Sequence, residues 1–177
     1  MSNLTKMLTI ASAIAIAVAI AIGIGISGAA TAAHADRSGA VAGSCEQRFD
    51  QAVETYIRTT HERDAEGWAS VLHPDVTVVF AGGDVLYGKE ATMDWVRGFF
   101  ADPEWTQTFD ELTRVVDGCR SGFVLFDSVY TPAPGADPKP LVIGLTFTHE
   151  RGRWLVLHNQ DSNGPAAGAH PAVQPHP

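Results

Sequence analysis

The hydrophobic and polar positions divide the chain into a helical first part and a strand-rich second part. Apolar residues recur at helical spacing over residues 44–63, where Ser44 and Gln47 form a capping box that predicts the helix start. The segment "AEGWASVL" predicts a short second helix, and residues 89–100 predict a third amphipathic one. Between them, "DVTVVFAGGDVLYG" is typical of a β-hairpin that turns at residues 82–84.

From Trp105 onward the pattern is strand-like. Four segments are separated by the turns "DG" and "RG" and by the loop "PAPGADPKP". The four segments are "WTQTFDELTRVV", "CRSGFVLFDSVYT", "LVIGLTFTHE" and "RWLVLHNQDS". The order helix, helix, hairpin, helix and four strands predicts a single α+β domain.

The last strand has an unusual end, because both of its faces become polar in "GRWLVLHNQDS". Strict alternation places His158 and Gln160 on the face of Trp154, with Asn159 and Asp161 on the other face. A strand becomes polar on both faces where it leaves a packed core, either for solvent or for a cavity with a polar mouth. Only the second interpretation implies a protein with a pocket.

The N-terminal residues have the pattern of a secretory signal peptide. Lys6 precedes an apolar run over about 10–26, and small residues follow, with cleavage expected after Ala35. A retained membrane anchor is the alternative, since a run of roughly 17 residues is at the lower limit for spanning a bilayer. We therefore expect a secreted or cell-envelope protein with these parts: signal peptide 1–35, linker 36–44, folded domain 45–162 and disordered tail 163–177.

Charge and cysteine content narrow the class of protein. The chain has 20 acidic and 12 basic residues, a net charge of −8, and the leader holds one of the basic residues and no acidic one. Such a surface argues against nucleic acid as a partner. Cys45 and Cys119 both follow the leader, and in an oxidising compartment we expect them to form a disulfide that ties the first helix to the sheet. Two free thiols are the alternative.

Sequence motifs for metals and cofactors are missing. The four histidines of the expected domain, at positions 61, 73, 149 and 158, do not have the spacing of metal ligands. No nucleophile elbow, phosphate loop or dinucleotide-binding motif occurs. We expect no metal site and no cofactor.

Three segments in combination resemble the SnoaL-like branch of the nuclear-transport-factor-two-like superfamily. They are "AVETYIRTTHERDAEGWASVLHPDVTVVF", "YGKEATMDWVRGFF" and "RGRWLVLHNQDS", and the resemblance covers residues 45–162. It implies three helices packed in a strongly curved mixed β-sheet that forms a cone with a pocket at its open end. It also implies that the last strand lines this pocket. The branch commonly carries two alternating histidines on that strand, whereas Gln160 follows His158 here, so a paired-histidine mechanism or metal pair is not carried over.

The candidate site residues follow from these patterns and this resemblance. His158 is the first catalytic candidate, as a general acid or base near neutral pH, and Asp127 is the second, as a carboxyl among apolar neighbours. The alternatives are a histidine satisfied by backbone partners and an aspartate that points to water. The ligand-binding candidates are Tyr56, Trp95 and Tyr130, on elements that border the pocket in the family, and Gln160 as a polar anchor.

Three hypotheses remain open. The first is an exported protein that binds a small, largely apolar molecule in its pocket. The second is an enzyme of the isomerase, cyclase or dehydratase type that uses His158 or Asp127 to move a proton next to a carbonyl. The third is a dimerising assembly module, and a homodimer is compatible with all three.

Overall fold

The computed structural model describes residues 30–165, so the apolar run of the expected signal peptide and most of the expected tail lie outside the described residues. Three helices are formed: α1 (Ala30–Glu62), α2 (Ala65–Ser70) and α3 (Lys89–Phe100). The strands are β1 (Leu72–Val79), β2 (Val85–Tyr87), β3 (Thr106–Gln107), β4 (Asp110–Asp117), β5 (Ser121–Thr131), β6 (Lys139–Glu150) and β7 (Arg153–Asn163). No helix within this part of the chain is both long and apolar enough to cross a membrane.

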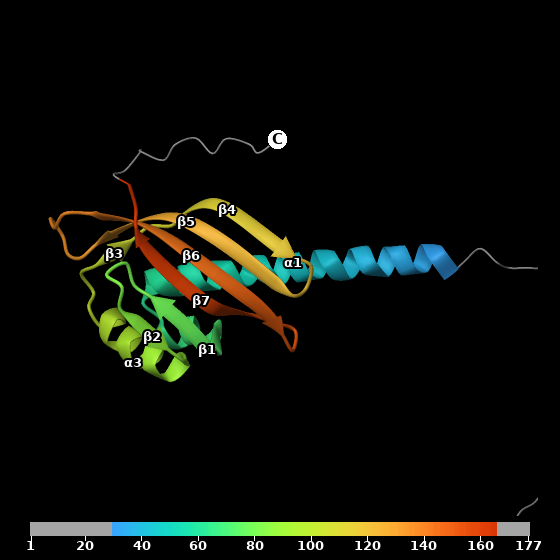
Figure 1. Ribbon diagram of the computed structural model, residues 1–177, viewed down its shortest axis with the longest axis horizontal. Coiled ribbons are helices and arrows are strands. Elements are labelled where there is room, and N and C mark those ends of the chain that lie inside the picture. The colour runs from blue at the N-terminus through green and yellow to red at the C-terminus, as the bar shows by residue number, and fades with distance from the viewer. Residues whose placement is uncertain (1–29, 166–177) are drawn as a thin grey trace, which may run out of the picture.

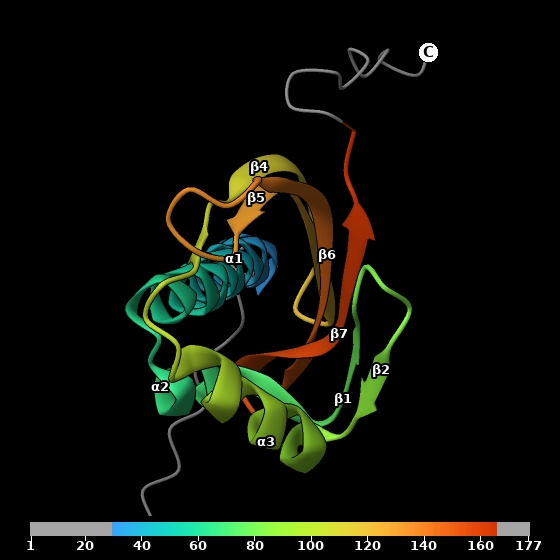
Figure 2. The same ribbon diagram turned by 90° about the vertical axis from the view of Figure 1, so that its left-hand side faces the viewer.

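The strands form one mixed sheet in the order β2-β1-β7-β6-β5-β3, and β4 also pairs with β5. All neighbours are antiparallel except β1 and β7, which run parallel. The sheet curls around α1, and α2 and α3 lie beside the end of α1 (Figures 1 and 2). The predicted α+β cone is therefore confirmed.

The predicted start of the first helix is wrong. Helix α1 begins at Ala30, so residues 36–44 are helical and do not form an irregular linker. Because residues before Ser44 are already helical, Ser44 cannot act as an N-cap. The expected disordered tail also starts too early, because β7 continues to Asn163.

Two further boundaries differ from the prediction. The second helix ends at Ser70 and the chain is already extended at Leu72, before His73, which is the residue that Pro74 restricts. The single strand expected from Trp105 is divided into β3 and β4. Both strands pair with β5 in the same register, so the predicted strand is interrupted only at residues 108 and 109.

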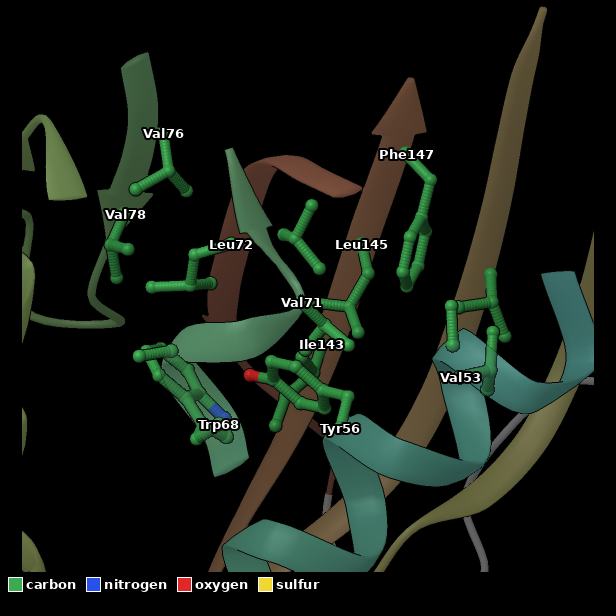
Figure 3. Packing of buried hydrophobic residues seen from close by; sticks show 14 of the residues in the cluster. Val53, Tyr56, Trp68, Val71, Leu72, Val76, Val78, Ile143, Leu145 and Phe147 are labelled. Atoms are coloured by element: carbon green, nitrogen blue, oxygen red, sulfur yellow. The ribbon is translucent and has the colours of Figure 1, made fainter. Parts of the chain in front are cut away.

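The apolar stripe of α1 packs inside the curved sheet. Phe49, Val53 and Tyr56 are buried as their spacing predicts, and the Phe49 ring meets the rings of Phe147 and Trp154 edge-on at 5.1 Å. The buried core continues to α2 and β6, as Figure 3 shows. Burial of this stripe fixes which face of α1 meets the sheet.

The structure contains the expected Cys45–Cys119 disulfide. Cys119 lies in the turn between β4 and β5, so the bond joins α1 to this hairpin. Nearby, the Trp154 indole donates a hydrogen bond of 3.0 Å to the backbone oxygen of Cys45. These two contacts hold α1 against the β4–β5 turn and against β7.

Candidate functional site

A cavity of about 370 Å³ lies between the helices and the inner face of the sheet. Its volume is in the usual range for small-molecule sites. Its wall includes seven aromatic residues: Tyr56, Trp68, Phe80, Trp95, Phe99, Phe100 and Tyr130. Figure 3 shows Tyr56 from α1 and Trp68 from α2 pointing into the same interior region.

One side of the cavity is a stack of rings. Trp95 lies between Phe80 and Phe99, with ring centroids 4.6 and 4.8 Å apart. Phe99 in turn stacks on Trp105 at 4.4 Å. Trp95 remains 42% exposed, so this aromatic wall reaches from the core to the solvent.

A β-bulge in β7 determines which side chains face the cavity. Val156 pairs with Phe147 and His158 pairs with Thr146, so Leu157 has no partner in β6. The extra residue reverses the alternation of the strand from this point on.

Because of the bulge, Trp154 and Val156 at the start of β7 share the inner face with Asn159 and Asp161 near its end. Asn163 also lines the cavity. The strand becomes polar on this face because it leaves the packed core for the cavity wall.

The inner polar residues form a hydrogen-bonded chain. The Tyr56 hydroxyl donates to Oδ1 of Asn159 at 2.6 Å, and Nδ2 of Asn159 donates to Oδ1 of Asp161 at 2.7 Å. Asn159 is 3% exposed and Tyr56 is 5% exposed. The chain therefore connects α1 to β7 through the interior and holds the Asp161 carboxyl in one orientation.

The other carboxylate oxygen of Asp161, Oδ2, accepts no hydrogen bond from residues 30–165. In this part of the chain, the single fully buried side-chain atom without a partner is Nε2 of His149. Oδ2 of Asp161 is therefore accessible, and it is the acceptor that a bound molecule can reach.

Burial raises the pKa of Asp161 from 3.8 to about 6, although the hydrogen bond from Asn159 opposes this shift. Burial and then the nearby charge of Asp161 also raise the pKa of Tyr56 well above its ordinary value. At neutral pH the site therefore holds a protonated phenol and a carboxylate that is a stronger base than an exposed one.

Three of the four predicted ligand-binding residues line this cavity: Tyr56, Trp95 and Tyr130. Within the described chain, Gln160 and His158 do not line it. His158 and Gln160 follow the bulge at positions that face away from the cavity, so the predicted place of both side chains at the pocket mouth is wrong.

Asp127 also lies outside the cavity wall formed by the described residues. It is on β5, where Val124, Phe126 and Ser128 are buried on the opposite face. The structure thus brings neither catalytic candidate to the cavity. The carboxyl found there belongs to Asp161, which strict alternation assigns to the wrong face.

The other histidines of the domain are dispersed. His61 packs near Phe109, His73 pairs with Glu150 at 3.3 Å, and Nδ1 of His149 lies 3.1 Å from the backbone oxygen of Cys119. Residues 30–165 contain no group of three or more His, Cys, Asp or Glu side chains arranged to hold a metal ion.

The SnoaL-like domain family matches residues 53–157 of the chain. The match ends at the bulge, so Asn159, Asp161 and Asn163 lie beyond it. No curated protein matches the chain significantly.

Solved structures with similar folds have low sequence identity. A ketosteroid isomerase-like protein from Erwinia carotovora atroseptica is 14% identical, with 66% of this chain and 94% of that chain covered and a TM-score of 0.56. An NTF2-like protein of unknown function from Pseudomonas putida is 15% identical, with coverages of 75% and 95% and a TM-score of 0.59. A domain with a cystatin-like fold from Nostoc punctiforme is 11% identical, with coverages of 69% and 78% and a TM-score of 0.60. These similarities establish the fold.

Proposed function

Because this chain belongs to the SnoaL-like domain family, whose fold supports ligand binding or isomerase-type chemistry, we propose that its cavity binds a small, largely apolar molecule. The observation that carries the proposal is the Asp161 carboxyl, held by Asn159 in a cavity with aromatic walls. A cavity of this kind combines a large apolar surface with a few oriented polar groups, which is the usual composition of ligand sites.

Oδ2 of Asp161 determines which kind of ligand atom can bind next to it. A carboxylate oxygen accepts hydrogen bonds, so the complementary ligand atom is a hydroxyl or another donor at the edge of an apolar body. The aromatic rings of Trp95 and Phe99 then cover the apolar part of the molecule.

Binding of the neutral fluorescent probe N-phenyl-1-naphthylamine tests this proposal. We expect saturable binding to the wild type, and about tenfold weaker binding after Trp95→Ala, because a large ring contact is lost. Tyr87→Ala is the matched control, since Tyr87 is an aromatic residue that is 74% exposed and does not line the cavity. Equal loss in both variants, or no saturable binding to the wild type, would contradict a role for the cavity.

A second function, proton transfer next to a carbonyl, is favoured by the raised pKa of Asp161. A carboxylate with a pKa of about 6 is a better base than an ordinary one and is still largely ionised at neutral pH. In this proposal Oδ2 of Asp161 takes a proton from the carbon beside a ketone, leaving an enolate, and the resulting carboxylic acid returns the proton. Asp161 takes the role that sequence alone assigns to His158 or Asp127.

Exchange of the α-protons of 2-tetralone in D₂O, followed by proton NMR, tests this second function. We expect the wild type to accelerate exchange, with a rate that rises as the pH passes about 6, and Asp161→Asn to abolish the acceleration. His158→Gln changes a titratable residue on the outer face and should leave the rate unchanged. Acceleration that survives Asp161→Asn would exclude Asp161 as the base.

We further propose export to the cell envelope or beyond, and assembly as a homodimer. The apolar leader after Lys6 and the disulfide between Cys45 and Cys119 support export. N-terminal sequencing of the protein recovered outside the cytoplasm should begin at Asp36, and light scattering should give twice the mass of one chain. An intact leader would favour the membrane-anchor alternative, and a monomeric mass would exclude the homodimer.

A further inference from the structure

Three polar side chains form a row across neighbouring strands at one end of the cavity. Gln107 of β3 pairs with Tyr130 of β5, and Tyr130 pairs with Lys139 of β6. All three residues line the cavity. The fold therefore places an amide, a phenol and an ammonium group side by side against the same space.

Each member of the row can donate a hydrogen bond toward the cavity. Nε2 of Gln107 donates to Oγ of Ser128 at 3.2 Å, which uses one of its two amide hydrogens. Burial and then the charge of Asp102 raise the pKa of Tyr130, so its hydroxyl keeps its proton at neutral pH.

Lys139 is the single basic residue among the described residues that line the cavity. Its ammonium group makes no hydrogen bond or ion pair with residues 30–165. By contrast, the other lysine in this range, Lys89, donates to the backbone oxygen of Ala69 at 2.6 Å. The positive charge of Lys139 is therefore not neutralised by residues 30–165, and it lies at the rim of the cavity.

The register of the sheet sets the distance between this row and Asp161. Asp161 pairs with Ile143, four residues along β6 from Lys139. With a rise of about 3.4 Å per residue and about 4.8 Å between strands, the two Cα atoms are roughly 14 Å apart. Leu141 and Ile143 line the cavity between the two polar ends.

We propose that Gln107, Tyr130 and Lys139 form a subsite for an anionic group, so that the ligand is an elongated apolar molecule with a carboxylate or similar anion at one end. This inference rests on the proposed function, because it assigns one end of the same cavity. The other end of the ligand meets Asp161, and the apolar middle lies against Leu141, Ile143 and the ring of Phe99.

The net charge of the protein makes this assignment testable. The chain carries a net charge of −8, and the charge of Asp102 acts on Tyr130, so nonspecific electrostatics disfavour an anionic ligand. A preference for an anion over its neutral counterpart must therefore come from local donors. Lys139 supplies the compensating charge at this position.

The test compares two probes that share the phenylnaphthylamine skeleton. One is neutral N-phenyl-1-naphthylamine, and the other is 1-anilinonaphthalene-8-sulfonate, which adds an anionic group. We expect the wild type to bind the sulfonate more tightly, and Lys139→Gln to weaken sulfonate binding about fivefold while the neutral probe binds as before. Arg151→Gln is the control, because it removes a positive charge just beyond the opposite end of β6.

The outcomes separate this inference from the proposed function. If the neutral probe binds and Trp95→Ala weakens it, but the sulfonate is not preferred or is indifferent to Lys139→Gln, the subsite is overturned and the cavity proposal stands. An equal effect of Arg151→Gln would also overturn the subsite, since it would show general electrostatics. If neither probe binds saturably, the proposed function itself fails.

Discussion

Asn159 uses both ends of its amide to connect Tyr56 with Asp161. Its Oδ1 accepts from the Tyr56 hydroxyl at 2.6 Å, and its Nδ2 donates to Asp161 at 2.7 Å. All of these groups lie in or beside an apolar cavity, where an unpaired polar group is costly. The orientation of the Asp161 carboxyl therefore depends on a residue of α1 that is far away in the sequence.

Tyr56→Phe and Asn159→Ala should not have additive effects on stability. Each single variant leaves a buried polar group unpaired and should reduce the free energy of unfolding by about 1–3 kcal/mol. The double variant should lose less than the sum, with a coupling energy of about 1 kcal/mol. Denaturant unfolding of the four proteins measures this, and strictly additive losses would show that the hydrogen bond contributes nothing.

Asp161→Asn should stabilise the folded state at neutral pH. The pKa of Asp161 is raised from 3.8 to about 6 on folding, so the folded state binds the proton more tightly and wild-type stability falls as pH rises across this window. Replacing the carboxyl with an amide removes this penalty, which is about 3 kcal/mol at pH 7 and nearly zero at pH 3.5. The unfolding midpoints of the wild type and of Asp161→Asn, measured at both pH values, test this predicted difference in stability. A difference that does not depend on pH would contradict the raised pKa.

Removing the disulfide should destabilise the domain throughout the pH range. Cys45 and Cys119 are 74 residues apart, and in the chain-entropy model a bond closing such a loop contributes about 4 kcal/mol. The double variant Cys45→Ser and Cys119→Ser should lose up to this amount in urea unfolding, and the wild type should approach the same value after reduction. Reductant should have no effect on the double variant.

Gly122→Ala and Gly98→Ala should have effects of opposite sign. A Cβ atom on Gly122 would overlap the ring of Phe49, so this substitution should cost about 1–3 kcal/mol through overpacking. A Cβ on Gly98 meets no atom within 4 Å, and alanine in this exposed helical position should add about 0.5–1 kcal/mol. Thermal unfolding of both variants tests the close approach of α1 to β5.

Most of the fold can be predicted from the sequence because its signals are local. The helical spacing of Phe49, Val53 and Tyr56 identifies the face of α1 that is buried. The "RG" turn is formed with positive φ at both Arg151 and Gly152, as a tight hairpin turn requires, and it sets the register at the start of β7. The cysteine pair and the resemblance to a cone fold then add the long-range contacts that periodicity does not contain.

The site is harder to predict because it depends on the β-bulge at Leu157, the residue of β7 that has no partner in β6. Alternation from Trp154 places His158 and Gln160 inward, but the bulge at Leu157 reverses the faces and brings Asn159 and Asp161 to the cavity. No glycine or proline in "WLVLHNQ" marks the bulge in the sequence. The aromatic residues Tyr56, Trp95 and Tyr130 are found more easily because their elements precede this irregularity or lie outside it.

The most direct test of the central claim is a carboxyl ¹³C NMR titration of Asp161, with and without saturating N-phenyl-1-naphthylamine. A side chain held in an apolar ligand cavity should titrate at about 6 in the free protein, and its pKa should move further when the probe removes the remaining water. A pKa near the ordinary 3.8 that does not respond to the probe would mean that Asp161 faces solvent, and the proposed site would be contradicted.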